Sequence, residues 1–169
     1  MQDLTALAAT TLAELIETRQ VSCAEVMHAH LGQIERVNPA VNALIQRLSP
    51  EQALDQARQA DAVRAPRGKL HGVPVTIKDG RKVKGFVCSL GTRSPHNDVP
   101  DEDATVVARL RAQGAIVLGL ANIPDFEMSF ETDNLLYGRT TPQEQRMIDE
   151  GRERRTRRRY VVWGDAEKR

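Results

Sequence analysis

Apolar side chains near the N-terminus recur at the spacing of one helix face. The apolar positions are Leu4, Leu7, Leu12, Leu15 and Ile16. Charged residues fall on the other side of the same stretch, as in a helix that buries one face. The pattern predicts a first helix that ends near Arg19.

A capping signal predicts the start of a second helix. Ser22 is followed three positions later by Glu25, and such a pair can satisfy two free backbone N–H groups at a helix N-terminus. The apolar face of this helix contains Val26, Leu31 and Ile34. We expect Asn38-Pro39 to end it, because proline lacks the N–H that a helix interior requires.

A short strand and a third helix are predicted next. Residues 41–45 are mostly apolar and follow the expected helix end, which favours a strand. Ser49 then repeats the capping signal, with Pro50 at the first helical position and Gln52 at the third. The third helix is expected to extend to about Val63.

The second half of the chain alternates strands and helices. Residues 74–77 and 115–119 are apolar and rich in β-branched residues, which predicts two buried strands. Between them, residues 80–99 are rich in loop signals and residues 102–113 have helical apolar spacing; residues 124–130 suggest a further short helix. The alternation predicts an α/β fold, with helices packed on a sheet that is at least partly parallel.

Composition supports one folded domain in the cytoplasm. The chain has 169 residues, of which 40% are hydrophobic and 28% charged, close to the values of globular proteins. No apolar run approaches the roughly 20 residues that span a bilayer, and the N-terminus lacks the basic start of a secretory signal. We therefore expect a cytoplasmic protein with no membrane partner.

The last part of the chain has a different character. Residues 139–169 hold ten basic and six acidic side chains, and six arginines fall within residues 152–159. We place a boundary near Thr140, with a domain over 1–140 and an arginine-rich, poorly ordered tail over 141–169. The alternative is a non-enzymatic binding protein whose tail contacts nucleic acid or an acidic partner. Clustered arginines without a nucleic-acid-binding fold are more often a solvated tail, so we expect no nucleic-acid partner.

The sequence gives no signal for a cofactor or a metal. Neither GxGxxG nor GxxxxGK[ST] occurs in the chain. His28 and His30 are two positions apart on a predicted helix, which turns them to different faces, and we interpret both as helix-surface residues. His71 and His96 lie in predicted loops without a spaced partner. The two cysteines lie far apart, so we interpret them as reduced thiols.

Lys78 is the candidate catalytic residue. It follows an apolar strand and precedes Asp79, which places an ammonium group at the end of a buried strand, where catalytic groups of open α/β sheets often lie. Desolvation there would favour neutral lysine, the form that acts as a general base. The alternative is an ordinary surface ion pair between Lys78 and Asp79.

From this point the chain resembles the amidase signature family. The matching text is LHGVPVTIKD at 70–79, GT at 91–92, DEDATVVARLRAQGAIVLG at 101–119 and ANIPDFEMSFETDNLLYGRT at 121–140. The segment ERVNPAVNALI at 35–45 is similar to the opening part of the family. The resemblance covers about 140 of the 169 residues, and the blocks occur in the family's order.

The resemblance implies a fold and a mechanism. The fold would be the N-terminal portion of the amidase-signature fold, with helices packed on an incomplete mixed sheet. The family hydrolyses carboxylic amides of small molecules through a serine nucleophile, a bridging serine and a lysine. Lys78 matches that lysine, the base, and Asp79 matches its acidic neighbour, a possible supporting residue. Asn134 and Gly138 match positions that lead towards the family's glycine-rich loop.

The match stops after Thr140. The family continues with a Gly-Gly-Ser-Ser-Gly loop and then the nucleophile, and these 169 residues contain neither. The serines of the chain are Ser22, Ser49, Ser89, Ser94 and Ser129. We therefore expect a truncated or frame-shifted amidase that is inactive as this chain alone, or a composite site whose serines come from another chain. An incomplete sheet would also leave an open edge through which the chain could self-associate.

Overall fold

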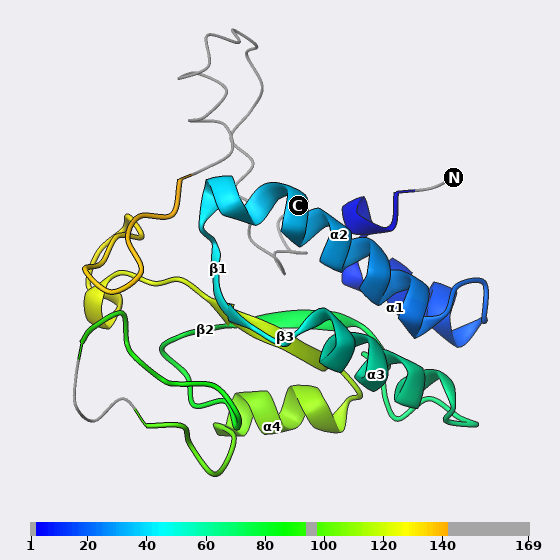
Figure 1. The fold of residues 1–169 in the computed structure, drawn as a ribbon. Coiled ribbons are helices and arrows are strands. Elements are labelled where there is room, and N and C mark those ends of the chain that lie inside the picture. The colour runs from blue at the N-terminus through cyan, green and yellow to red at the C-terminus, as the bar shows by residue number, and fades with distance from the viewer. Residues whose placement is uncertain (1–2, 94–97, 142–169) are drawn as a thin grey trace, which may run out of the picture.

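A three-stranded mixed sheet forms the centre of the protein (Figure 1). This computed structural model describes residues 3–93 and 98–141. Strand β1 spans Leu44–Arg47, β2 spans Pro74–Lys78 and β3 spans Ile116–Ala121. The order is β1-β3-β2, with β3 antiparallel to β1 and parallel to β2. The predicted strands at 74–77 and 115–119 are confirmed, with small shifts of their ends.

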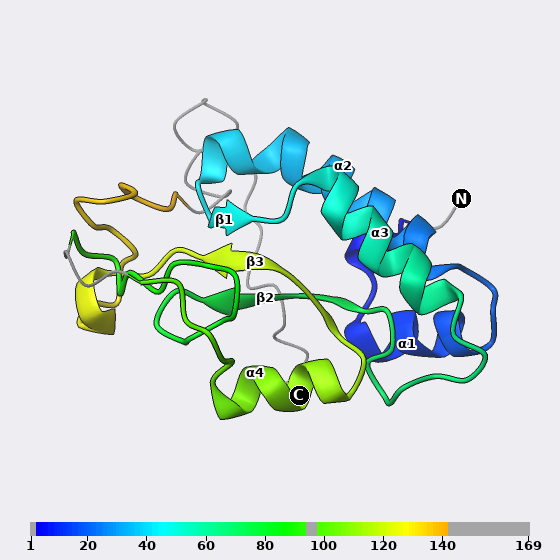
Figure 2. The ribbon, with the colours of Figure 1, turned by 60° about the horizontal axis from the view of Figure 1, so that its bottom comes forward.

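Helices cover both faces of this sheet (Figures 1 and 2). Helices α1 (Ala9–Glu17), α2 (Cys23–Val41) and α3 (Pro50–Asp61) contribute to one hydrophobic core, and α4 (Thr105–Ala112) contributes to the other. The α/β class predicted from the alternating pattern is therefore confirmed. Because both faces are covered, β3 is buried along nearly its whole length.

An irregularity in β3 allows this one strand to contribute side chains to both hydrophobic cores. Val117 and Gly119 pair with successive residues of β2, so Leu118 is an extra residue in the register. Ile116 and Leu118 pack in the core with α1, α2 and α3, whereas Val117 and Leu120 pack in the core with α4. Without the extra residue, Leu120 would point to the same face as Leu118.

The two predicted capping boxes are present. At the start of α2, the Ser22 N–H donates to Glu25 Oε2 over 2.8 Å, and the Glu25 N–H donates to Ser22 Oγ over 3.1 Å. At the start of α3, Ser49 and Gln52 make the same reciprocal pair at 3.0 and 3.1 Å. Both helices therefore begin where the sequence predicts.

The predicted end of the second helix is wrong. Helix α2 continues through Pro39 to Val41, and it ends at Asn42, which adopts the left-handed conformation with φ of 53°. Pro39 lies in the last turn of the helix, where the missing N–H removes only one backbone hydrogen bond. The Asn38 side chain then accepts bonds from the next two backbone N–H groups, at Ala43 and Leu44. The strand expected at 41–45 is consequently displaced to β1.

The predicted first helix is interrupted. A 3-10 turn, η1, spans Leu4–Ala6 and is capped by the Asp3 side chain. The chain is extended at Leu7 and Ala8 before α1 begins, so the apolar stripe of 4–16 belongs to two separate elements. Periodicity alone does not reveal this break, because both elements bury the same side of the stretch.

Two further helix boundaries differ from the sequence prediction. The helix expected over 102–113 begins only at Thr105, because the Asp103 carboxylate binds the Lys84 N–H at 2.8 Å and Arg111 at 3.0 Å. The helix expected over 124–130 is only the 3-10 turn η2 at Asp125–Glu127. Phe126 and Glu127 have φ of 52° and 59°, which stops an α-helix from forming.

Candidate functional site

Lys78 is the last residue of β2, as the sequence predicts. It pairs with Ala121, the last residue of β3, so the two parallel strands end together next to the segment after β3 (Figure 2). The Lys78 side chain is exposed, and its ammonium makes no hydrogen bond or ion pair with any residue in 3–93 or 98–141. The described residues therefore do not supply the desolvation that we expected around this amine.

Asp79 is not the surface partner of Lys78. Its side chain is completely buried and points into the protein. The carboxylate accepts bonds from the Ser89 N–H at 2.9 Å, from the Ser89 hydroxyl, and from the Gly91 N–H at 3.4 Å. The Asp79 N–H donates to the Ala121 carbonyl at 3.1 Å. The alternative of a simple surface ion pair is wrong, and Asp79 instead fixes the backbone that follows Lys78.

The loop held by Asp79 contacts the segment after β3. The Leu90 carbonyl accepts a bond from the Phe126 N–H at 2.9 Å. Gly91 has φ of 71°, and a Cβ there would lie 3.2 Å from the carbonyl oxygens of Ile123 and Pro124. Only glycine tolerates both this conformation and this approach. The Gly-Thr pair at 91–92, which the sequence marks only as a family resemblance, therefore has a packing reason.

A buried asparagine orders the segment that follows η2. The Asn134 side chain donates to Asn122 Oδ1 at 2.8 Å and to the Ile123 carbonyl at 2.7 Å. Its own oxygen accepts bonds from the N–H groups of Leu136 and Tyr137. The sequence marks Asn134 only by resemblance, whereas the structure shows that it satisfies four polar groups of a turn.

The side chains of Asn122, Thr140 and Asn42 continue this network to the end of α2. The Asn122 amide donates to the Gly138 carbonyl and to Thr140 Oγ1, each at 3.0 Å. The Thr140 hydroxyl in turn donates to the Asn42 carbonyl at 2.6 Å, and the Asn42 amide donates to the Tyr137 carbonyl at 2.8 Å. Sequence reasoning missed Asn122 and Asn42, because asparagines at ordinary loop positions carry no spacing signal.

The described serines are all engaged in local bonds. Ser22 and Ser49 cap helices, and the Ser129 hydroxyl accepts a bond from the Glu131 N–H at 3.3 Å. The Ser89 hydroxyl donates to Asp79 and accepts the Gly91 N–H at 3.2 Å. Ser94 lies outside the described residues. None of the described serines contacts Lys78, so this part of the chain contains no serine and lysine pair arranged for nucleophilic attack.

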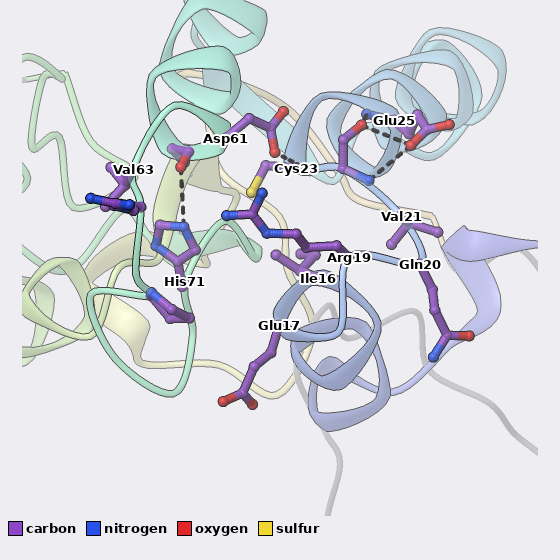
Figure 3. A pocket seen from close by; sticks show the side chains of 14 residues that line it. Ile16, Glu17, Arg19, Gln20, Val21, Cys23, Glu25, Asp61, Val63 and His71 are labelled. Atoms are coloured by element: carbon purple, nitrogen blue, oxygen red, sulfur yellow. Dashed lines mark hydrogen bonds between the residues drawn. The ribbon is translucent and has the colours of Figure 1, made fainter.

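A pocket of about 420 Å³ lies at the other end of β2, between α1, α2 and α3 (Figure 3). His71 lines it, with Nε2 3.2 Å from the Ala60 carbonyl and Nδ1 accepting the Arg67 N–H at 3.3 Å. Cys23 is fully buried, and burial together with the nearby Asp61 carboxylate raises the pKa of its thiol to about 12. Such a thiol is not a nucleophile near neutral pH.

His28, His30 and Cys88 are the other described residues that the sequence offers as candidate ligands or nucleophiles. His28 is exposed and His30 is buried, so the two do point to different faces, but the interpretation of His30 as a surface residue is wrong. His30 Nδ1 bonds the Val26 carbonyl at 2.8 Å, and burial lowers the pKa of its imidazole. Burial and the negative charge of Asp79 raise the pKa of the Cys88 thiol.

Over residues 3–93 and 98–141, no three His, Cys, Asp or Glu side chains are grouped so as to hold a metal ion. In the same part of the chain, no helix has the length and hydropathy to cross a bilayer. His96 and the arginine-rich residues 152–159 lie outside the described residues. The predictions that concern them, including the tail as a nucleic-acid contact, are therefore not addressed by the structure.

Comparison with known proteins relates this chain to amidases and to an amidotransferase subunit. A family model described as Amidase matches residues 25–143. A glutamyl-tRNA(Gln) amidotransferase subunit of Salinispora arenicola (strain CNS-205) is 42% identical over 143 residues, which are 83% of this chain and 29% of that protein. Indoleacetamide hydrolase of Bradyrhizobium diazoefficiens is 40% identical over 135 residues, covering 78% of this chain and 26% of the relative.

A solved structure shows the same fold. The structure of 6-aminohexanoate cyclic dimer hydrolase complexed with substrate superposes with a TM-score of 0.72 at 29% identity, over 83% of this chain and 28% of that chain. The chain thus spans less than a third of the length of the relatives it matches. Its fold is an N-terminal portion of theirs, with a small mixed sheet between helices. Together with the family match over 25–143, this shows that the chain belongs to the amidase family.

Proposed function

We propose that this chain is the part of an amide hydrolase that supplies the catalytic lysine, and that its 169 residues do not hydrolyse amides by themselves. The observation that carries the proposal is the position of Lys78, which ends β2 with a fixed backbone and an exposed side chain that no described residue pairs with. The Asp79 carboxylate fixes that backbone from inside the protein. A general base needs a fixed position and an amine that no other group holds, and Lys78 offers a fixed backbone and a side chain that no described residue pairs with.

In the proposed reaction, neutral Lys78 removes a proton from a bridging serine, which at the same time takes the proton of the nucleophilic serine. The nucleophile attacks the carbonyl carbon of a carboxylic amide, and the returned proton leaves with the amine. Water then hydrolyses the acyl-enzyme by the same proton path. The substrate class is a small carboxylic amide, which agrees with the names of the amide hydrolase relatives.

The proposed lack of activity follows from the serines. The Ser89 hydroxyl, the one nearest in sequence to Lys78 among the described serines, is committed to Asp79. Serine nucleophile, bridging serine and lysine act as a unit, so a lysine without the two serines does not give a fraction of the activity. We propose that the bridging serine and the nucleophile belong to polypeptide that is not contained in these 169 residues.

An ammonia-release assay tests the proposed inactivity. The purified 169-residue chain is incubated with indole-3-acetamide, and the wild type is compared with Lys78→Ala. We expect both to match the buffer blank. Ammonia release by the wild type that disappears in Lys78→Ala but persists in Lys82→Ala, another exposed lysine, would show that the chain is active alone and would overturn this part of the proposal.

A further inference from the structure

A short segment after β3 presents large apolar side chains to solvent. Six large hydrophobic side chains are exposed in the described part of the chain, and four of them fall between residues 126 and 135. These four are Phe126, Met128, Phe130 and Leu135, with Met128 86% and Leu135 89% exposed and Phe130 fully so. We call residues 126–135 the apolar segment. Such a concentration within ten residues is unusual for a surface that remains in water.

The backbone of the apolar segment is held in place. Asn134 binds the Ile123 carbonyl from inside, and the Phe126 N–H bonds the Leu90 carbonyl. The Thr140 N–H donates to the Thr132 carbonyl at 2.9 Å, and Arg139 pairs with Glu131 at 2.7 Å. These bonds fix the segment in an arrangement that leaves its apolar side chains outside the core. The segment therefore presents these side chains from an ordered backbone, which lowers the ordering cost of binding.

The apolar segment lies at the Lys78 end of the sheet. Strands β2 and β3 both end there, and the segment follows β3 a few residues after Ala121 (Figures 1 and 2). The pocket between α1, α2 and α3 lies at the opposite end of β2, on the side of His71. A partner that covers the apolar segment is thus placed next to the exposed Lys78 side chain.

The size of the relatives indicates what covers the segment. The chain spans 29% of the amidotransferase subunit and 28% of the hydrolase chain of known structure. More than two thirds of each relative must therefore pack outside the part that corresponds to this chain. That part of each relative has to contact this portion of the fold, and apolar side chains held at the Lys78 end are suited to such a contact.

The charges around the segment argue against a second copy of this chain. Asp125 and Asp133 are exposed, and no described cation pairs with either. A two-fold symmetric contact would place the same surface on both sides, so carboxylates that lie near the symmetry axis would approach their copies. Such an approach opposes association. A different polypeptide can present basic or neutral groups there.

We propose that the apolar segment 126–135 is the docking surface for a polypeptide carrying the remaining part of an amidase-family domain. This inference rests on the proposed function for the identity of the partner, because that polypeptide would also bring the serines to Lys78. Docking itself depends on the apolar side chains and not on the lysine. The two claims can therefore be separated by experiment.

A capture experiment tests the docking surface. An amidase-family relative is divided into two polypeptides after the residue aligned with Thr141. These two parts are first shown to co-purify. The C-terminal part, called the remainder, is then the probe. The tagged 169-residue chain is co-expressed with this remainder, and the captured remainder is quantified. We expect capture by the wild type and a loss of at least tenfold in the double variant Phe130→Asp, Leu135→Asp, since two buried charges without partners oppose the contact.

A matched double variant controls for added charge. Val99→Asp with Val106→Asp introduces two carboxylates at positions that are 55% and 51% exposed outside the apolar segment, and it should retain capture. Circular dichroism confirms that each variant folds. Lys78→Ala should also retain capture. A variant that loses activity but retains capture therefore tests the proposed function and leaves the docking proposal unaffected.

Three results would overturn the docking proposal. The first is that the 169-residue chain fails to capture the remainder, although the N-terminal part of the relative captures the same remainder. The second is equal capture by the wild type and by Phe130→Asp, Leu135→Asp. The third is a homodimer of the 169-residue chain, detected by light scattering, that the same double variant converts to a monomer. That result would assign the apolar segment to a second copy.

Discussion

The two ends of strand β2 differ in how completely they are covered. At the end that begins after His71, Gly72 packs against the buried Cys23 side chain, and three helices contribute to one buried core. At the other end, the backbone is fixed just as firmly, but Lys78 and Phe130 project into solvent. One end stabilises the fold, and the other presents groups for contact.

This difference separates the end of the sheet that the three helices stabilise from the end to which we assign the proposed function. The α1, α2 and α3 core buries a contiguous set of apolar side chains, so it should unfold as one cooperative unit with the sheet. At the Lys78 end, polar bonds through Asp79 and Asn134 hold the loops that follow β2 and β3, in addition to the apolar core on the α4 face. Substitutions at the two ends should therefore change different measurements.

The largest expected effect concerns the reactivity of Cys23. Burial and the Asp61 carboxylate raise the pKa of this thiol to about 12, so at pH 8 its thiolate fraction is about a thousandfold below that of an unfolded cysteine. We expect iodoacetamide at pH 8 to modify the half-buried Cys88 first and Cys23 only after urea is added. Peptide mass mapping over time measures both rates. Equal labelling of the two thiols in the native protein would show that the helical end is open.

The second effect is the cost of filling the space at Gly72. A Cβ on this residue, which has φ of 75°, would overlap the Cys23 side chain. Overpacking and the left-handed conformation together should lower the free energy of unfolding by about 4 kcal/mol in Gly72→Ala. Gly85→Ala is the control, because Gly85 has φ of 90° but open space around it, and about 1 kcal/mol is expected. Urea titration measures both, and equal losses would argue against tight packing at Cys23.

The third effect tests the bonds below Lys78. Asp79→Ala removes the acceptor of the Ser89 and Gly91 N–H groups inside the protein, and it should lower the free energy of unfolding by about 3 kcal/mol. Asp133→Ala, at an exposed position of the same end, should change it by less than about 0.5 kcal/mol. If the chemical denaturation curve of Asp79→Ala superposes on that of the wild type, the Asp79 hydrogen bonds do not stabilise this end of the sheet.

The smallest effect is a pH dependence at the helical end. Burial lowers the pKa of His30 in the folded protein, so protonation favours the unfolded state. The stability linked to His30 is present above the ordinary histidine pKa and is lost as the pH falls below it. His30→Gln should therefore have a flatter dependence of stability between about pH 7 and pH 5 than the wild type. Thermal melts measure it, with the exposed His28→Gln as a control that keeps the wild-type slope.

Sequence reasoning predicts the regular elements because their signals are local. The capping boxes at Ser22 and Ser49 lie within four residues, and the strand at 74–77 is read from a short apolar run. The end of α2 was not predictable in this way. Asn42 in a left-handed conformation and the Asn38 side chain, rather than Pro39, end the helix, and these contacts depend on where β1 lies.

The candidate site was predictable only in part. Lys78 is visible in the sequence as a lysine at a strand end, and the structure places it there. The partners of Asp79 were not visible, because Ser89 and Gly91 are ten or more residues away and meet it only through the fold. The exposure of the apolar segment 126–135 also depends on the fold. The apolar residues of this segment in the sequence would be equally typical of a buried element.

The most direct test of the central claim is the amidase activity of the captured complex. The 169-residue chain bound to the remainder of a relative is assayed for ammonia release from indole-3-acetamide, with wild type, Lys78→Ala and Lys82→Ala compared at equal capture. We expect hydrolysis by the wild type and by Lys82→Ala, and a loss of at least a hundredfold in Lys78→Ala. Undiminished hydrolysis by the Lys78→Ala complex would contradict the assignment of Lys78 as the base.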